Sequence, residues 1–466
     1  MGGEPTVATF SGVRSGDAPL TWGQRGIWHA IERNLPGHYN VCVSVPVPPD
    51  VPADVGAVAG AVGRLLDRHE ALRTRILVAD GEPRQIVERA GTLPLEVTEF
   101  AAADPHRLVE QHRAAPFDYL AGDLPVRVVL NTANGTVREI LLVLCHVAVD
   151  LQAVCIVAGD LTALLAGEPL PAPGTQPLDL ARRQQQAAAR RRSTTSVGYW
   201  ITESRRIRSP MFVDAGPPQR PPFRSAVLTS PAIGAGARIL ATRHGVTDST
   251  VYQAACAALL GRWTGQRRCH LRMITDNRFW PGHREIVTHL CQLGLFVLDL
   301  PADTGFVDLL KETERAALRA HWHAYYDQGE LDRATDELQR EKGGPGHADC
   351  YFNDSRLDGP PVWTVTSKPA ADDAPKSLPY GDGTAPVRDA DVWRATALST
   401  FGWQRDPGWM QCSFSLRVSG PSAVPSISLS ADTRYLPAQE MERFLLAFED
   451  LLVEACRDTT AVDVSR

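Results

Sequence analysis

The chain has 466 residues, of which 44% are hydrophobic and 22% are charged, a balance typical of a globular protein of about two domains. Its 48 basic and 54 acidic residues give a formal net charge of −6, which does not favour a nucleic acid as the partner. No apolar run is long enough to suggest a membrane span, and residues 1–19 lack the charged-then-apolar layout of a signal peptide.

Hydrophobic periodicity predicts several elements in the first half of the chain. Residues 54–75 are a helix candidate, because apolar side chains recur there at steps of three and four. Residues 126–130 and 140–144 are expected to be strands, the second one buried. A further helix is expected over residues 154–165, ending near Gly167 and Pro169.

A segment rich in proline and glycine, residues 168–178, is expected to link the two halves. Residues 181–193 follow it and are interpreted as an exposed basic helix. The arginines of this helix are Arg182, Arg183, Arg190, Arg191 and Arg192. They form either a solvated face or a contact surface for an acidic partner protein.

The second half is expected to begin near Tyr199, with loops at 205–224 and 340–392. Helices are predicted at residues 235–244, 249–263, 306–323 and 438–456, and strands at 349–352, 414–418 and 426–430. Each half therefore combines helices with strands, which indicates an α/β fold.

The nine cysteines form no C-x-x-C pair, so the sequence signals neither a zinc site nor a disulfide framework. Most of them lie in apolar surroundings, and a reducing cytoplasm fits this pattern best. Cys145 is a candidate nucleophile because it precedes a histidine. However, neighbouring residues of a strand point to opposite faces, so we expect Cys145 to face away from His146.

The strongest candidate for chemistry is His146, which directly follows the strand predicted at residues 140–144, with Asp150 four residues further on. A histidine held at the end of a rigid strand is well placed to act as a general base. On its own the spacing favours a structural histidine over a catalytic one.

The segment resembles the H-H-x-x-x-D-G motif of condensation domains from nonribosomal peptide synthetases. Other stretches resemble motifs of this family in the same order, at residues 20–28, 39–40, 68–74, 116–127, 199–200, 261–266, 276–278 and 294–297. The resemblance covers nearly the whole chain. It implies two chloramphenicol-acetyltransferase-like α/β lobes, residues 1–180 and 181–466, arranged as a V-shaped pseudo-dimer around a central tunnel.

The resemblance also implies roles for individual residues. His146 would orient the attacking amine or accept its proton, and Asp150 would form a structural ion pair with Arg278. Two positions depart from the motif, because Cys145 replaces its first histidine and Leu151 replaces its glycine. Cysteine can fill a packing position, whereas the leucine side chain is expected to narrow the substrate channel.

The implied reaction joins an acyl or peptidyl thioester to an amine or hydroxyl acceptor. The thioester is carried by the phosphopantetheine arm of a carrier protein, so no bound cofactor or metal is required. We expect a free-standing, monomeric, cytoplasmic enzyme. Two alternatives stay open, namely a catalytically inactive protein that recruits a partner, and an acyltransferase that uses a soluble coenzyme A thioester.

Overall fold

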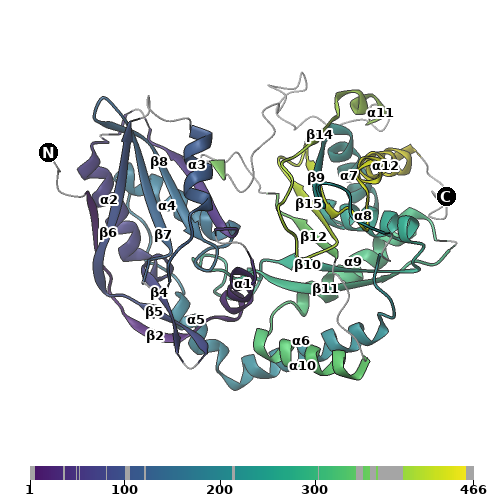
Figure 1. Cartoon of the computed structure of the whole chain (residues 1–466), viewed down its shortest axis with the longest axis horizontal. Helices are drawn as coiled ribbons and strands as arrows, with labels where there is room; N and C mark the ends of the chain where they lie inside the picture. The colour runs from purple at the N-terminus through teal and green to yellow at the C-terminus, as the bar shows by residue number, and fades with distance from the viewer. Residues whose placement is uncertain are drawn as a thin grey trace.

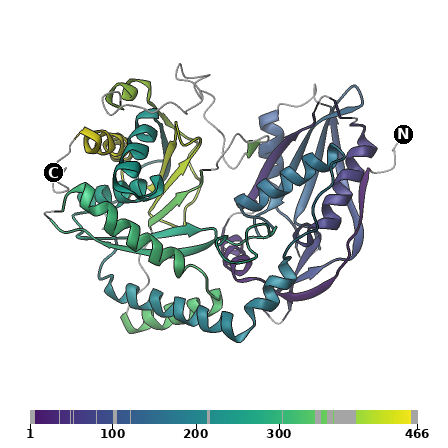
Figure 2. The ribbon, with the colours of Figure 1, turned by 180° about the vertical axis from the view of Figure 1, so that it is seen from behind.

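The computed structural model describes residues 6–34, 37–48, 50–51, 53–79, 81–99, 105–119, 122–212, 216–302, 304–342, 350–356, 364–365 and 392–457. Within these ranges the chain forms two α/β halves that lie side by side (Figure 1). Helices α5 (Pro177–Gln184) and α6 (Ala187–Arg206) run along the lower edge of that view and lead from one half to the other. The view from behind shows the same arrangement (Figure 2).

The first half contains a six-stranded sheet and a three-stranded sheet. The larger sheet has the order β1 (Val7–Ser11), β6 (Ala90–Glu99), β7 (Val126–Ala133), β8 (Thr136–Cys145), β3 (Asn40–Pro46) and β13 (Thr364–Val365). The smaller sheet has the order β2 (Gly16–Pro19), β5 (Glu82–Val87) and β4 (Thr74–Ala79). The helices of this half are α1 (Trp22–Glu32), α2 (Val55–Arg68), the 3-10 helix η1 (Glu70–Arg73), α3 (Pro105–Ala114) and α4 (Leu151–Leu165).

Apolar side chains fill both faces of the larger sheet. Helices α2 and α4 pack on one face through Val58, Leu65 and Val154. Helices α1 and α3 cover the other face, where Trp28 packs with Cys145. The sheet is therefore buried on both sides, which explains why β8 reads as an uninterrupted apolar run.

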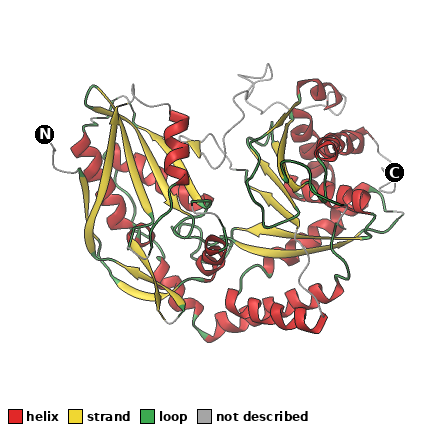
Figure 3. Cartoon of the chain, viewed as in Figure 1, coloured by secondary structure: helices red, strands yellow, loops and turns green. Residues whose placement is uncertain are grey.

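The second half contains a seven-stranded sheet. Its order is β11 (Gln292–Asp299), β10 (Arg268–Thr275), β12 (Cys350–Asp354), β15 (Phe414–Ser419), β16 (Ser426–Asp432), β9 (Phe223–Thr229) and β14 (Thr400–Trp403). Its helices are α7 (Pro231–His244), α8 (Asp248–Thr264), α9 (Phe306–Trp322), α10 (Gln328–Lys342), α11 (Val392–Ala395), the 3-10 helix η4 (Thr396–Leu398) and α12 (Ala438–Arg457). In Figure 3, α7, α8 and α12 lie on the side of this sheet that faces away from the first half.

One strand crosses between the halves. Strand β13 pairs antiparallel with β3, placing Thr364 opposite Ser44 and Val365 opposite Val43. The sheet of the first half is therefore completed by a strand that follows most of the second half in the sequence.

The structure confirms an α/β fold with several sheets, and the predicted helices and strands of both halves are present. Four details are wrong. The helix predicted over residues 54–75 ends at Arg68. The basic helix is divided between α5 and α6, and Tyr199 lies inside α6. Helices α1, α3 and α10, together with several strands, had no counterpart among the predictions. The 340–392 loop prediction falls mostly outside the described residues.

The boundary at residues 180 and 181, the pseudo-dimer relation and the central tunnel stay predictions. None of the helices in the described ranges is both long and apolar enough to cross a membrane. The cytoplasmic location expected above stays a prediction as well.

A glycine in α2 tests how closely this helix packs on β1. A Cβ at Gly63 would collide with the Thr9 carbonyl oxygen, whereas a Cβ at Gly60 would meet only Arg64 Nη1 at 3.7 Å. We expect Gly63→Ala to lower the free energy of unfolding by about 1–3 kcal/mol. Gly60→Ala should raise it by roughly 0.5–1 kcal/mol, because alanine favours the helix. Chemical denaturation measures both variants, and equal stabilities would contradict this packing.

Candidate active site

His146 lies at the first position after β8, in a turn that leads into α4. Its backbone N–H donates to the Tyr39 carbonyl oxygen at 3.1 Å. Its ring Nδ1 lies 2.6 Å from the Val149 carbonyl oxygen. A carbonyl oxygen can only accept, so Nδ1 carries the proton and Nε2 keeps its lone pair. The turn therefore presents the neutral ring in the tautomer that a general base requires.

The surroundings of His146 favour the uncharged ring. Burial lowers the pKa of His146, and the positive charge of Arg417 lowers it further, although the Val149 carbonyl and Asp150 oppose both effects. Arg417 lies on β15 between the core residues Leu416 and Val418, so it points to the opposite face of the sheet. The imidazole is consequently available as a base at neutral pH.

A second histidine, His289, packs against the first. The two rings meet edge to face with their centroids 4.7 Å apart. Nδ1 of His289 lies 3.5 Å from the same Val149 carbonyl oxygen. Burial, together with the neighbouring His146, lowers the pKa of His289 to about 3. Neither His289 nor Arg417 is predicted from the sequence, because neither lies in a motif beside His146.

The Asp150 carboxylate is fully buried and has donors on both oxygens. Oδ1 accepts the backbone N–H of Ala153 at 2.8 Å, which caps α4. Oδ1 also accepts Nη2 of Arg278 at 2.5 Å, and Oδ2 accepts the backbone N–H of Leu290 at 3.0 Å. The ion pair that the resemblance implied is therefore present, and it joins the two halves of the chain.

Arg278 in turn organises its own loop. Nη1 donates to the carbonyl oxygens of His283, Arg284 and Ile286 at 3.1, 3.2 and 2.9 Å. The preceding residue Asn277 has φ = 56°, a left-handed conformation that asparagine tolerates better than most residues. One arginine thus fixes the loop that approaches His146 from the second half.

The two residues that depart from the motif have different surroundings. Cys145 is buried on the side of the sheet covered by α1, and its sulfur contacts the Tyr119 hydroxyl. Burial raises the pKa of Cys145 to about 11, so the thiol is not a nucleophile at neutral pH. Leu151 is the first residue of α4 and stays partly exposed beside Asp150. Its effect on a substrate channel stays a prediction.

Comparison with known proteins identifies the family. The model of the Condensation domain matches residues 14–345. Phosphinothricin tripeptide synthetase PhsC of Streptomyces viridochromogenes is 30% identical over 331 residues, which cover 66% of this chain and 30% of that protein. Bacitracin synthase 3 of Bacillus licheniformis is 25% identical over 282 residues, covering 58% of this chain and 4% of that protein. The chain therefore spans less than a third of these relatives.

Solved structures share the fold. SgcC5 from Streptomyces globisporus has a TM-score of 0.67 at 18% identity, covering 95% of this chain and 100% of that chain. The condensation domain of the Monacolin K polyketide synthase MokA has a TM-score of 0.71 at 17% identity, and the match covers 96% of this chain and 99% of that chain. This chain belongs to the Condensation domain family, whose reaction class is condensation-type acyl transfer in nonribosomal peptide and related biosynthesis.

Asp150→Asn tests the ion pair between the halves. It would leave the Arg278 guanidinium buried without a countercharge, so we expect a loss of about 3–5 kcal/mol in the free energy of unfolding. Asp299→Asn is the control, because Asp299 pairs with Arg206 and Arg268 but is 53% exposed, and should cost less than about 1 kcal/mol. Denaturant titration measures both, and similar losses would contradict a special role for Asp150.

The low pKa of His289 predicts a pH dependence of stability. Between about pH 3 and pH 6.5 the unfolded chain binds a proton at this residue that the folded chain does not. Stability should therefore fall as the pH drops below 6.5, by up to about 1.4 kcal/mol per pH unit from this residue. His289→Gln should weaken the dependence of the free energy of unfolding on pH, which denaturation curves recorded at pH 5, 6 and 7 measure. An unchanged slope would show that His289 can be protonated in the folded protein.

Proposed function

We infer that this chain joins a carrier-bound acyl or peptidyl thioester to an amine or hydroxyl acceptor, with His146 as the general base. The observation that carries this proposal is the hydrogen bond from His146 Nδ1 to the Val149 carbonyl, which leaves Nε2 as a proton acceptor. The low pKa of the ring keeps Nε2 unprotonated at neutral pH.

The reaction balances without a bound cofactor. The acceptor nitrogen or oxygen attacks the thioester carbonyl carbon, and its proton passes to Nε2 of His146. When the tetrahedral species collapses, the carbon–sulfur bond breaks and the thiolate takes up the proton from the imidazole. The carrier protein supplies the phosphopantetheine arm that bears the thiol. The positive charge of Arg417, which is close enough to lower the pKa of His146, would favour the negative charge on the tetrahedral oxygen.

A coenzyme A thioester as donor is the second candidate. The starter condensation domain of rhizomide synthetase, which shares the fold at a TM-score of 0.67 and 15% identity, was solved with C8-CoA and Leu-SNAC. The same attack on a thioester carbonyl applies to both donors. A recruitment role without catalysis is the third candidate, favoured by Leu151 at the glycine position of the motif. The free-standing and monomeric states stay predictions.

The test compares the wild type with His146→Ala in an intact-mass assay that contains an acyl-loaded carrier protein and an amine acceptor. Loss of the base should reduce product formation by about 10²–10⁴-fold. The free energy of unfolding should stay close to the wild-type value. His244→Ala, a histidine in α7 of the second half, is the control and should keep wild-type activity.

The remaining outcomes separate the candidates. Turnover of acyl coenzyme A but not of the acyl carrier would assign the second candidate. An inactive wild type that binds the carrier equally well with and without His146 would assign the recruitment role and overturn the catalytic proposal.

A further inference from the structure

A cavity of about 260 Å³ lies between α6 and the end of α9, outside the site around His146. It is lined by Ala188, Arg191, Arg192, Thr195, Ser196, Trp322 and His323. Its volume is large enough for a phosphoryl group and part of the chain that bears it. The lining combines cations, hydroxyls and an indole, so it can bind a ligand that is anionic at one end.

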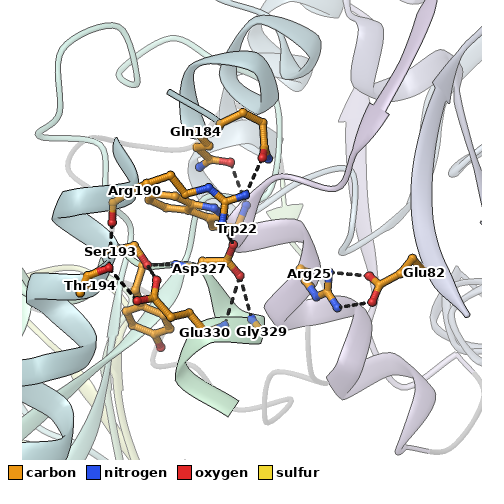
Figure 4. A network of polar contacts seen from close by, with 12 residues as sticks. Trp22, Arg25, Glu82, Gln184, Arg190, Ser193, Thr194, Asp327, Gly329 and Glu330 are labelled. Carbon is orange, nitrogen blue, oxygen red and sulfur yellow. Dashed lines mark hydrogen bonds and ion pairs between the residues drawn. The ribbon is translucent and has the colours of Figure 1, made fainter. Parts of the chain in front are cut away.

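Within the part of the chain that the structure describes, neither arginine of this cavity has a carboxylate partner. Among the described residues, no ion pair is formed by Arg191 or Arg192. The opposite face of α6 is different, as Figure 4 shows. There Arg190 pairs with Asp327 at 2.8 Å, while Ser193 and Thr194 donate to Glu330 at 2.5 and 2.8 Å. The unneutralised charge of α6 is therefore concentrated on the face that lines the cavity.

Aromatic rings hold one of these cations in place. The Arg192 guanidinium lies 3.9 Å from the centre of the Trp280 ring and 5.0 Å from that of Trp322. Such contacts orient a guanidinium without neutralising its charge. The Trp322 side chain is 52% exposed, so its ring can also contact a ligand. An oxyanion of a ligand can bind the Arg192 guanidinium while an apolar part of the same ligand packs on the Trp322 ring.

Two polar atoms beside the cavity have no hydrogen-bond partner among the described residues. Within the described residues, Nδ1 of His323 and Nε1 of Trp280 are buried without a hydrogen bond. Both atoms are therefore available to a ligand that is held beside the two arginines. Ser196 adds a hydroxyl on the same helix, whereas the Thr195 hydroxyl already donates to the Arg191 carbonyl oxygen at 3.0 Å.

We propose that this cavity binds the phosphoryl group of the thioester donor. The proposal rests on the function inferred above, because a phosphate ester is common to a carrier's phosphopantetheine arm and to coenzyme A. A phosphoryl group has several charged oxygens and can accept bonds from two guanidinium groups and a hydroxyl at once, whereas one arginine suffices for a carboxylate.

The same loop connects this cavity to the site of His146. Trp280 follows Arg278 by two residues, and Arg278 forms the ion pair with Asp150. Trp280 also packs on Tyr325, with the ring centres 5.9 Å apart. A phosphoryl group beside Arg192 would therefore contact the structure that also supports the histidine turn, and the binding energy would serve to position the thioester.

Isothermal titration of the intact protein tests the site with three probes, namely pantetheine, 4′-phosphopantetheine and coenzyme A. We expect 4′-phosphopantetheine to bind at least about tenfold more tightly than pantetheine. Arg191→Gln and Arg192→Gln should each remove most of this difference and leave the binding of pantetheine unchanged. Arg191 is exposed and makes no described side-chain contact, so its variant should fold normally even where the loss of Arg192 loosens the two indoles.

Arg205→Gln is the matched control, because Arg205 lies on the same helix but pairs with Glu341 at 3.1 Å outside the cavity. Equal binding of 4′-phosphopantetheine and coenzyme A supports the shared phosphate ester as the ligand, and tighter binding of coenzyme A supports its additional phosphates. Equal binding of pantetheine and 4′-phosphopantetheine would overturn the proposal, as would a loss of binding in Arg205→Gln as large as in Arg191→Gln.

A short donor separates this proposal from the proposed function. An acyl N-acetylcysteamine thioester has no phosphate, so Arg191→Gln should turn it over at the wild-type rate while losing at least about tenfold in kcat/KM with the phosphopantetheine donor. An equal loss with both donors would overturn the phosphoryl site and leave the condensation activity standing. Phosphate-dependent binding without turnover of any donor would keep the site and overturn the activity.

Discussion

The Asp150 carboxylate accepts hydrogen bonds from the backbone of α4, from the backbone at Leu290 and from the Arg278 side chain. These donors come from both halves of the chain, so one buried carboxylate holds the loop of the second half against the start of α4. Because the carboxylate also caps α4, the helix begins where the His146 turn ends. A change at any one of the donors would therefore alter the position of the histidine.

Burial and charge act together on the two histidines. Both rings lie near the Val149 carbonyl oxygen, and both have lowered pKa values. Two imidazolium ions packed at this distance would repel each other, so the pair stays neutral and only one ring needs to exchange protons. The positive charge of Arg417, which comes from the sheet of the second half, also disfavours protonation of His146.

How much the sequence predicts depends on the range of the interaction. Strand β8, the histidine that follows it and the Asp150 cap all lie within residues 136–150, so a local pattern reveals them. Arg278 is 128 positions from Asp150, and only the resemblance to a family connects the two. His289 lies in an irregular segment without periodicity. Helix α10 escaped prediction because only Leu331 and Leu338 supply large buried side chains, too few to mark an apolar face.

The crossing strand β13 has a consequence for how the chain is synthesised. Its partner β3 is made more than 300 residues earlier, and on the ribosome the edge of the first sheet stays unpaired until residues 364–365 emerge. An unpaired edge strand of apolar composition is a template for association with other chains. The backbone of Val43 and Ser44 is thus open to such association until residues 364–365 are synthesised, and this short stretch of edge is a defined structural target for a chaperone.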